Sequence, residues 1–304
     1  MDAKKTKKIV VLATGGTIAG WATDASQPQN YKAGQVSVGD LLASAHPKTL
    51  GAQIDLESEQ VAQIDSKDMS YAVWQQLLAR LAHHLNRDEV QGVVIPHGTD
   101  TLEETAYFLQ AVLKPAKPVA LTCAMRAANA PDSDGPANLQ QALAWVLQPQ
   151  SQGVAVVAAG EVHAGATVQK QHSQQLNPFA ADPARQVLQP VPSVAQVLAC
   201  TAWPRVDVVM SHAGADGRGV RAAMRQPDAP QGWVVAGTGN GTVHQDLQAA
   251  LLEGQAQGAK VWRASRCAWG GVQSREGDVL PHAGLLSVAQ ARVALMLALL
   301  AEQS

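Results

Sequence analysis

The sequence predicts an α/β protein with a larger N-terminal domain, built on a doubly wound and mainly parallel sheet, and a smaller C-terminal α/β domain. Three observations favour this class. Apolar runs alternate with segments of helical periodicity, and two of these runs end in glycine followed by threonine. The length of 304 residues also exceeds what one core usually fills. Hydroxyl groups at the ends of parallel strands indicate an enzyme with a hydroxyl nucleophile.

In the first half, β-branched apolar runs predict four buried parallel strands, at residues 9–13, 92–95, 118–122 and 154–158. Apolar residues at helical spacing predict helices over 71–85, 102–113 and 137–147. Asp100 or Thr101 is placed to cap the second helix. Glu103 or Glu104 would complete a capping box there. Strand–helix alternation of this kind implies right-handed crossovers and helices on both faces of the sheet.

Five prolines interrupt a polar, irregular stretch at 178–204, and this stretch predicts a domain boundary. We therefore expect a catalytic domain over 1–185, a linker over 186–204 and a smaller domain over 205–304. In the smaller domain we expect strands at 206–210, 233–236 and 260–263, and helices at 243–253 and 287–301. No apolar run reaches the length that crosses a membrane.

Composition and charge limit the kinds of molecule that this protein is expected to bind. The net charge is -2, and basic residues are scattered apart from a cluster at 4–8, so no nucleic-acid partner is expected. The apolar run after that cluster is too short for a signal peptide, so we expect a cytoplasmic protein. Cys123, Cys200 and Cys267 form no CxxC pair, which suits a reducing compartment and small, buried thiols. Charged residues make up only 16% of the chain, which indicates a surface partly covered by another subunit.

The candidate chemistry lies in two threonine-bearing turns, one after each of the first two predicted strands. Thr17 ends the string TGGT, and Thr99 lies in the string HGTDT. A threonine hydroxyl is a poor nucleophile until a base or a preorganised hydrogen bond draws its proton away. Asp100 offers a carboxylate beside Thr99, and Lys170 would polarise Thr99 if the fold brings it close. The alternative is that both threonines are only turn residues and helix caps.

The remaining sequence patterns do not predict a metal site, a dinucleotide site or a serine-hydrolase site. The histidines at 83, 84, 163 and 172 lack the spacing of metal ligands, so no metal is expected, and His97 is expected to be structural. The glycines at 237–241 lack the register of a dinucleotide-binding loop. No GxSxG elbow occurs, which disfavours the α/β-hydrolase route to an amide.

Eight segments share one further property, which is their order along the chain. The longest are ATGGTIAG at 13–20 and HGTDTLEETA at 97–106, and shorter ones lie at 30–34, 66–69, 124–126, 134–139, 237–241 and 265–266. In this order they resemble the bacterial L-asparaginase and glutaminase-asparaginase family. The two long strings together are highly specific, and the matches span most of the chain.

The resemblance implies hydrolysis of the side-chain amide of L-asparagine to L-aspartate and ammonia, with glutamine as a slower substrate. It implies no metal and no organic cofactor. Thr17 would attack the amide carbon and hold an acyl intermediate, while Tyr31, on a loop at 21–34 that closes over the ligand, helps to take its proton. Thr99, Asp100 and Lys170 would form a second catalytic cluster.

The resemblance also implies how the substrate is bound. Ser66 and Asp100 take the places that bind the α-carboxylate and the α-ammonium. A backbone N–H near Thr99 or Ala124 would serve as an oxyanion hole. Lys67 departs from the family, which usually has glutamine there, and its charge near the ligand ammonium would raise the Michaelis constant relative to a Lys67→Gln variant. That expectation holds unless Lys67 turns outward or pairs with an acid such as Asp68.

The family resemblance further implies a tetramer, built as a dimer of dimers, in which a neighbour's C-terminal domain completes each site. The nearest equivalents of the neighbour's residues are Asn240 or Thr242, and Glu276. The alternative hypothesis is a noncatalytic amino-acid sensor or carrier, which would bind the same ligand in the same pocket without hydrolysing it. Release of ammonia from asparagine separates the two hypotheses.

Overall fold

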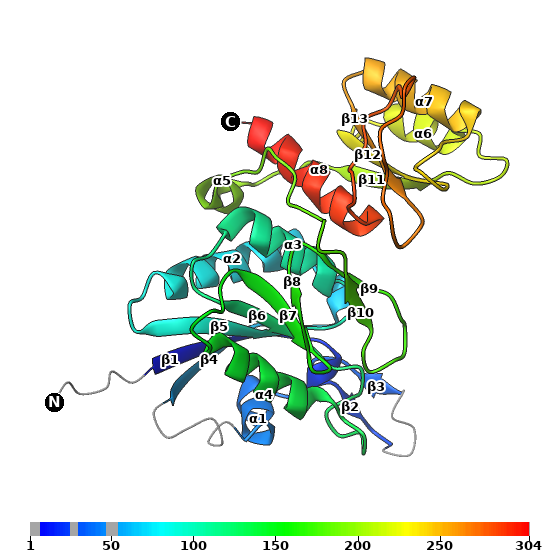
Figure 1. Cartoon of the computed structure of the whole chain (residues 1–304). Helices are drawn as coiled ribbons and strands as arrows, with labels where there is room; N and C mark the ends of the chain where they lie inside the picture. The colour runs from blue at the N-terminus through cyan, green and yellow to red at the C-terminus, as the bar shows by residue number, and fades with distance from the viewer. Residues whose placement is uncertain (1–6, 25–29, 47–53, 304) are drawn as a thin grey trace. The chain divides into compact units, whose positions relative to one another are not determined.

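The computed structural model divides into two units, and the first ends at Ala181. The middle layer of the first unit is a mainly parallel sheet (Figure 1). The structure describes residues 7–24, 30–46 and 54–303. Residues 4–6 of the basic cluster and 25–29 of the expected closing loop lie outside the described residues.

The sheet of the first unit has six strands in the spatial order β4 (Ile54–Ile64), β1 (Lys7–Gly15), β5 (Val90–Pro96), β6 (Val119–Thr122), β7 (Val154–Ala158) and β8 (Glu161–Ala164). Neighbouring strands run parallel, except that β8 pairs antiparallel with β7. The expected doubly wound, mainly parallel sheet is confirmed. The carboxyl ends of β1 and β5, which carry the two threonine strings, therefore meet at one edge.

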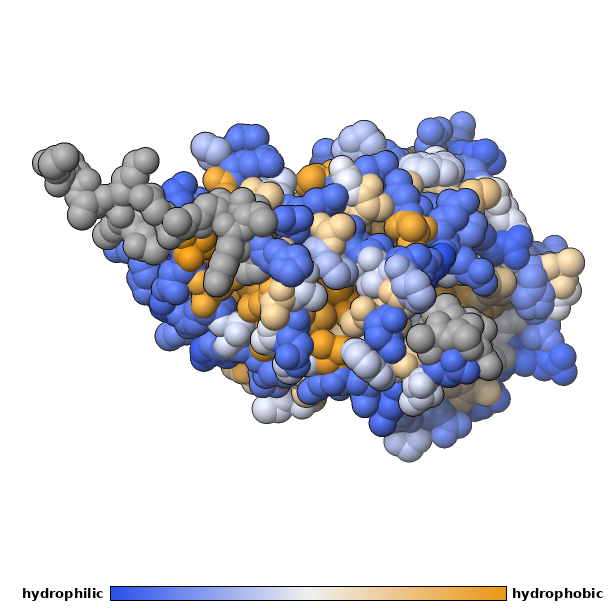
Figure 2. All heavy atoms as spheres, turned by 90° about the horizontal axis from the view of Figure 1, so that it is seen from below, coloured by the Kyte–Doolittle hydropathy of each residue, from blue (hydrophilic) through white to orange (hydrophobic). Residues whose placement is uncertain are grey.

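Among the described residues, four helices cover this sheet, two on each face: α1 (Val38–Ser44) and α4 (Gly135–Val146) below, and α2 (Tyr71–Leu85) and α3 (Leu102–Leu113) above (Figure 1). Viewed from the α1 and α4 side, the surface is largely hydrophilic, with apolar atoms gathered near its middle (Figure 2). Beneath it, Ile9 and Val11 of β1 pack with Leu139 and Leu143 of α4, all at most 1% exposed. Each such side chain contributes about 1.5–3 kcal/mol by leaving water.

The predicted helices at 71–85 and 102–113 are confirmed, since they coincide with α2 and α3. Strand β4 and helix α1 were not predicted. In β4, Glu57 and Glu59 alternate with Leu56 and Ser58, so the strand has no continuous apolar run. It is an edge strand with one neighbour, and such strands tolerate charge.

Glycine lets the turns after β1 and β5 approach each other. Gly16 has φ 82°, and a Cβ there would lie 2.3 Å from the Cα of Gly98. A Cβ on Gly98 would in turn lie 2.4 Å from Ser66 Oγ. Any side chain at these positions would separate the two turns, so the glycines bring the two threonines together.

Short elements surround this edge of the sheet: η1 (Thr17–Ala19), β2 (Trp21–Ala22), β3 (Tyr31–Lys32), η3 (Ser66–Asp68), β9 (Val168–Lys170) and β10 (Phe179–Ala181). Strands β2 and β3 form one antiparallel pair, and β9 and β10 form another. They carry Tyr31 and Lys170, respectively.

The second unit has a parallel sheet in the order β11 (Val206–Met210), β12 (Gly232–Gly237) and β13 (Lys260–Ser265). Its helices are α5 (Val194–Ala199), α6 (Arg218–Met224), α7 (Gln245–Ala256) and α8 (Val288–Glu302). Trp233 and Val235 of β12 pack with Leu247 and Leu251 of α7. The expected smaller α/β domain is confirmed, and residues 186–204, expected as a linker, fall in this unit and include α5.

The cysteines are free, but only Cys123 is buried; Cys200 is half-buried and Cys267 is exposed. The expectation of three buried thiols is therefore wrong, because Cys267 lies outside the strands and helices that form the core. Among the described residues, no helix combines the length and apolar character that a membrane crossing requires.

Candidate active site

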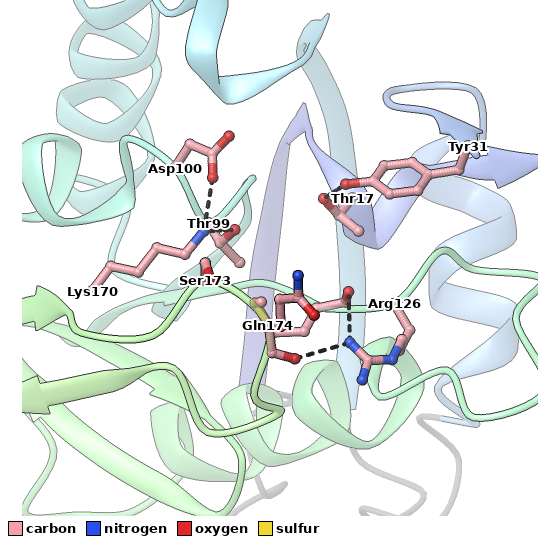
Figure 3. Close-up of a pocket in the computed structure, with 9 residues that line it drawn as sticks. Thr17, Tyr31, Thr99, Asp100, Arg126, Lys170, Ser173 and Gln174 are labelled. Carbon is pink, nitrogen blue, oxygen red and sulfur yellow. Dashed lines mark hydrogen bonds and ion pairs between the residues drawn. The ribbon is translucent and has the colours of Figure 1, made fainter. Parts of the chain in front are cut away.

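Thr17 and Thr99 face one cavity of about 420 Å³ (Figure 3). The described residues that line it are Thr17, Tyr31, Thr99, Asp100, Met125, Arg126, Lys170, Ser173 and Gln174. All five residues expected to be catalytic are in this set, although they come from positions as distant as 17 and 170. A cavity of this size admits a small amino acid.

Thr17 is hydrogen-bonded to Tyr31. Thr17 begins η1, separated from β1 by Gly16, and its Oγ1 lies 2.7 Å from the Tyr31 hydroxyl. The Tyr31 ring lies over Gly20, where a Cβ would come within 2.7 Å of ring atom Cδ2. The absence of a side chain at Gly20 therefore lets the ring reach Thr17.

Lys170 joins Thr99 and Asp100 into a second cluster. Its Nζ donates to Thr99 Oγ1 at 2.8 Å and to Asp100 Oδ1 at 2.7 Å. The Lys170 side chain is only 19% exposed, so its charge is opposed by the Asp100 carboxylate in a partly dry environment. An ammonium that donates to Thr99 Oγ1 orients that hydroxyl toward the cavity.

The expected capping box at α3 is wrong, because its side chains build the site instead. Thr101 is the N-cap residue, but its side chain makes no capping bond and donates to Ser66 O at 2.7 Å. Glu103 is buried and accepts a hydrogen bond from the backbone N–H of Lys170 at 2.6 Å. Glu103 in the first turn of α3 thus holds the backbone of Lys170, and the Thr99–Asp100 segment directly before the helix holds its Nζ.

Ser66 and Ala124 lie behind the cavity wall and are not among the described lining residues. Ser66 is buried, and its Oγ accepts from the backbone N–H of Asp100 at 3.1 Å. Ala124 is buried at the end of β6, where Asp134 accepts from the next two backbone N–H groups, those of Met125 and Arg126, at 3.0 Å. Ser66 thus fixes the backbone of Asp100, and Ala124 directly precedes the backbone that Asp134 holds.

Two family models match this chain. The family model described as "Asparaginase, N-terminal" matches residues 8–198, and "Glutaminase/Asparaginase C-terminal domain" matches 205–304. The chain belongs to the asparaginase family. It is therefore an amidohydrolase, and the resemblance found in its motifs is confirmed.

Three relatives illustrate this membership of the asparaginase family. L-asparaginase 2 of Escherichia coli (strain K12) is 34% identical, over 96% of this chain and 88% of the relative. Glutaminase-asparaginase of Pseudomonas fluorescens biotype A is 32% identical, over 90% of this chain and 79% of the relative. The crystal structure of a probable cytoplasmic L-asparaginase from Campylobacter jejuni has a TM-score of 0.87 at 33% identity, covering 96% of this chain and 95% of that one.

Lys67, the residue that departs from the asparaginase pattern, pairs with acids. Its Nζ lies 2.8 Å from Asp68 Oδ2 and 3.2 Å from Asp65 Oδ2. These carboxylates, Asp68 first, raise the pKa of Lys67. The Lys67 side chain is exposed and is not among the described residues that line the cavity. Lys67 therefore pairs with an acid, which is the condition under which its charge should not weaken substrate binding.

We therefore expect Lys67→Gln to change the Michaelis constant for asparagine by less than about twofold, because two carboxylates already screen the charge. Steady-state kinetics of the two proteins measure this. A tenfold gain in affinity would show that Lys67 acts on the ligand ammonium after all.

Four lining residues were not predicted: Met125, Arg126, Ser173 and Gln174. Arg126 connects two loops of the site, since its Nη1 donates to Gln174 O at 3.2 Å (Figure 3). Its Nε donates to Asp132 Oδ2 at 3.1 Å. The motif that contains Arg126 was recognised but given no role. Ser173 and Gln174 closely follow Lys170 in a polar segment. This closeness to Lys170 was the one sequence feature that could have indicated them as residues of the site.

The residues expected to serve a neighbouring subunit lie in the second unit. Asn240 uses its amide locally, because it donates to Gln273 O and accepts from Gln273 N, both at 2.8 Å. The Thr242 hydroxyl bonds to Thr238, and Glu276 is exposed. Their contact with another subunit stays a prediction.

Arg80 and Arg87 form an ion-pair network with Glu59 and Glu57 at the side of the sheet formed by β4. His84 lies beside both glutamates, with its Nε2 2.7 Å from Glu59 Oε1. The three side chains lie close enough to share a cation. Arg87 and Arg80 already occupy the carboxylates, and Arg87 Nη1 also lies 2.9 Å from His84 Nδ1. The Arg87 guanidinium lowers the pKa of Glu57 to about 2. Two guanidiniums in this position oppose a divalent cation, so the cluster is read as structural.

His97 supports the second cluster from inside. Its Nδ1 donates to Gly98 O at 2.7 Å, and its Nε2 accepts from the Thr105 hydroxyl at 3.1 Å. Thr105 Oγ1 in turn accepts from Trp74 Nε1. Complete burial lowers the pKa of His97 to about 4. This neutral ring fixes the backbone directly before Thr99.

This burial predicts how stability depends on pH. Between pH 4 and about 6.5, an unfolded His97 binds a proton and the folded one does not, so the free energy of unfolding rises with pH across this window. On acidification we expect a loss of about 3 kcal/mol from this residue. Urea unfolding at several pH values measures it, and a His97→Gln variant with the same slope would contradict the assignment.

Proposed function

We propose that this chain hydrolyses the side-chain amide of L-asparagine to L-aspartate and ammonia, with Thr17 as the nucleophile. The observation that carries the proposal is the shared cavity, in which the Thr17–Tyr31 pair and the Thr99–Asp100–Lys170 cluster both face the same ligand-sized space. Names of the relatives support asparagine as substrate and glutamine as a second one. One methylene changes discrimination by about 1–3 kcal/mol, so glutamine is expected to be slower.

In the first half-reaction, Thr17 Oγ1 forms a bond to the amide carbon. Its proton passes to the Tyr31 oxygen as the Tyr31 proton moves to the amide nitrogen, the C–N bond breaks, and ammonia leaves. The products are ammonia and an aspartyl ester on Thr17. Backbone N–H groups near Thr99 or Ala124 would stabilise the oxyanion, with an expected contribution of about 3–4 kcal/mol.

In the second half-reaction, water attacks the ester carbon. The Thr99 hydroxyl, oriented by Lys170, positions that water. As the ester bond breaks, a proton from the water passes to Thr17 Oγ1. The net reaction consumes one water and releases aspartate. The negative charge of Asp100, held beside Lys170, remains available to the substrate α-ammonium, while Ser66 fixes the Asp100 backbone.

The assembly is also part of the proposal. We infer a tetramer in which the second unit of a neighbour completes each site through Glu276, with Asn240 and Thr242 shaping the loop beside it. The free thiols fit the cytoplasm as the compartment. Analytical ultracentrifugation combined with activity measurement tests the assembly, because a fully active monomer would contradict it.

Ammonia release from asparagine tests the proposed function. The wild-type chain should release ammonia with turnover, and a coupled assay quantifies it. An amino-acid sensor or carrier would bind asparagine in the same cavity without releasing ammonia above background. Calorimetry on the same sample distinguishes that outcome from a failure to bind.

A further inference from the structure

The hairpin that carries Tyr31 is small, and something outside it must hold it in place. Strands β2 and β3 contribute two residues each, and their registered pairs are Trp21 with Lys32 and Ala22 with Tyr31. An isolated two-stranded hairpin is marginally stable in water. Yet the Tyr31 hydroxyl lies at hydrogen-bond distance from Thr17, so its position requires support.

The support is a side-chain amide that pairs with the hairpin backbone. Asn129 Nδ2 donates to Ala22 O at 2.7 Å, and Asn129 Oδ1 accepts from Ala22 N at 2.9 Å. The amide thus satisfies both backbone groups of Ala22, which is 2% exposed, as a neighbouring strand would. One residue earlier, the backbone N–H of Ala128 donates to Gly20 O at 2.9 Å, so the segment 128–129 follows the chain from Gly20 to Ala22.

We propose that Asn129 is a positioning residue for Tyr31. Ala22, which is bonded to the Asn129 amide, is the residue paired with Tyr31 across the hairpin. The Tyr31 ring packs directly against Gly20. Both points that fix the ring are therefore bonded to the 128–129 segment. This inference rests on the proposed role of Tyr31 in proton transfer at Thr17.

The anchor itself is rigid. The segment follows Met125 and Arg126, whose backbone N–H groups are held by Asp134, the residue that precedes helix α4. Asn138 of α4 donates to both Asp134 and Cys123 O. The segment that holds the hairpin is thereby tied to helix α4 of the first unit, through Met125, Arg126 and Asp134.

A double-mutant cycle tests the inference through activity. Asn129→Ala should lower kcat for asparagine about tenfold in the wild-type background, because misplaced catalytic groups lose effective concentration. In a Tyr31→Phe background the same substitution should lower kcat by less than about twofold, since the group it positions is already gone. Asn86→Ala, an exposed residue at the end of α2, is the matched control and should leave kcat unchanged.

Equal losses in both backgrounds would overturn the inference, because Asn129 would then act independently of Tyr31. Hydrogen exchange of the Ala22 amide gives a readout that needs no activity. It should accelerate at least about tenfold in Asn129→Ala while the Val93 amide in β5 keeps its protection. Unchanged exchange at Ala22 would also overturn the inference, whereas a wild-type chain that releases no ammonia would overturn the proposed function and leave this exchange result interpretable.

Discussion

Replacing Thr17 with alanine is expected to reduce ammonia release from asparagine on the order of 10⁴-fold or more, because the nucleophile of the first half-reaction is lost. The side chain contributes one hydrogen bond, to Tyr31, and is 9% exposed at the cavity, so the fold should tolerate the change. A coupled ammonia assay with purified protein measures the loss, and circular dichroism verifies the fold.

Serine at the same position is the informative control. Thr17→Ser keeps a hydroxyl near Tyr31 and should retain activity well above that of Thr17→Ala, at a lower rate because the β-branch that restricts the rotamer is missing. If the alanine and serine variants were equally active, the attacking oxygen would have to come from another group. Thr99 would then be the first candidate.

The second large effect is expected at Lys170. Lys170→Met removes the ammonium that bonds to Thr99 and Asp100, and we expect kcat to fall about 10²–10⁴-fold, the range of a group that assists proton transfer. The loss should appear mainly in kcat, because Asp100 remains in place. Steady-state kinetics separate kcat from the Michaelis constant.

Lys260→Met provides the matched control, since Lys260 also pairs with one carboxylate, that of Glu302, but lies in the second unit. Its kcat should equal the wild-type value. A Lys170→Met variant with wild-type kcat would remove Lys170 from the mechanism, whatever its distance from Thr99.

The sequence predicted most of the sheet and the shared site because those features are encoded locally. Buried parallel strands such as β5 and β7 are continuous apolar runs, and α2 and α3 repeat apolar residues at helical spacing. Edge strand β4 was not predicted because the polar residues 57–60 interrupt its apolar pattern. Glu57 and Glu59 of this stretch belong to the ion-pair network on one face.

The site shows the same division between local and nonlocal signals. Thr17 and Thr99 were found because each lies in its own string after a strand. Glu103 was expected as a cap and instead holds the backbone of Lys170, a contact between residues 67 positions apart. The contact of Asn129 with Ala22 spans 107 positions. Such contacts depend on the folded path of two loops, which no single segment specifies.

The covalent intermediate offers the most direct test of the account. Lys170→Met protein, mixed with asparagine and quenched in acid, should accumulate the aspartyl ester if Lys170 serves the second half-reaction. Mass spectrometry of peptides should then find one aspartyl adduct, on Thr17. An adduct on Thr99 would contradict the assignment of Thr17 as the nucleophile. No adduct on a variant that still releases ammonia would contradict the role of Lys170 in the second half-reaction.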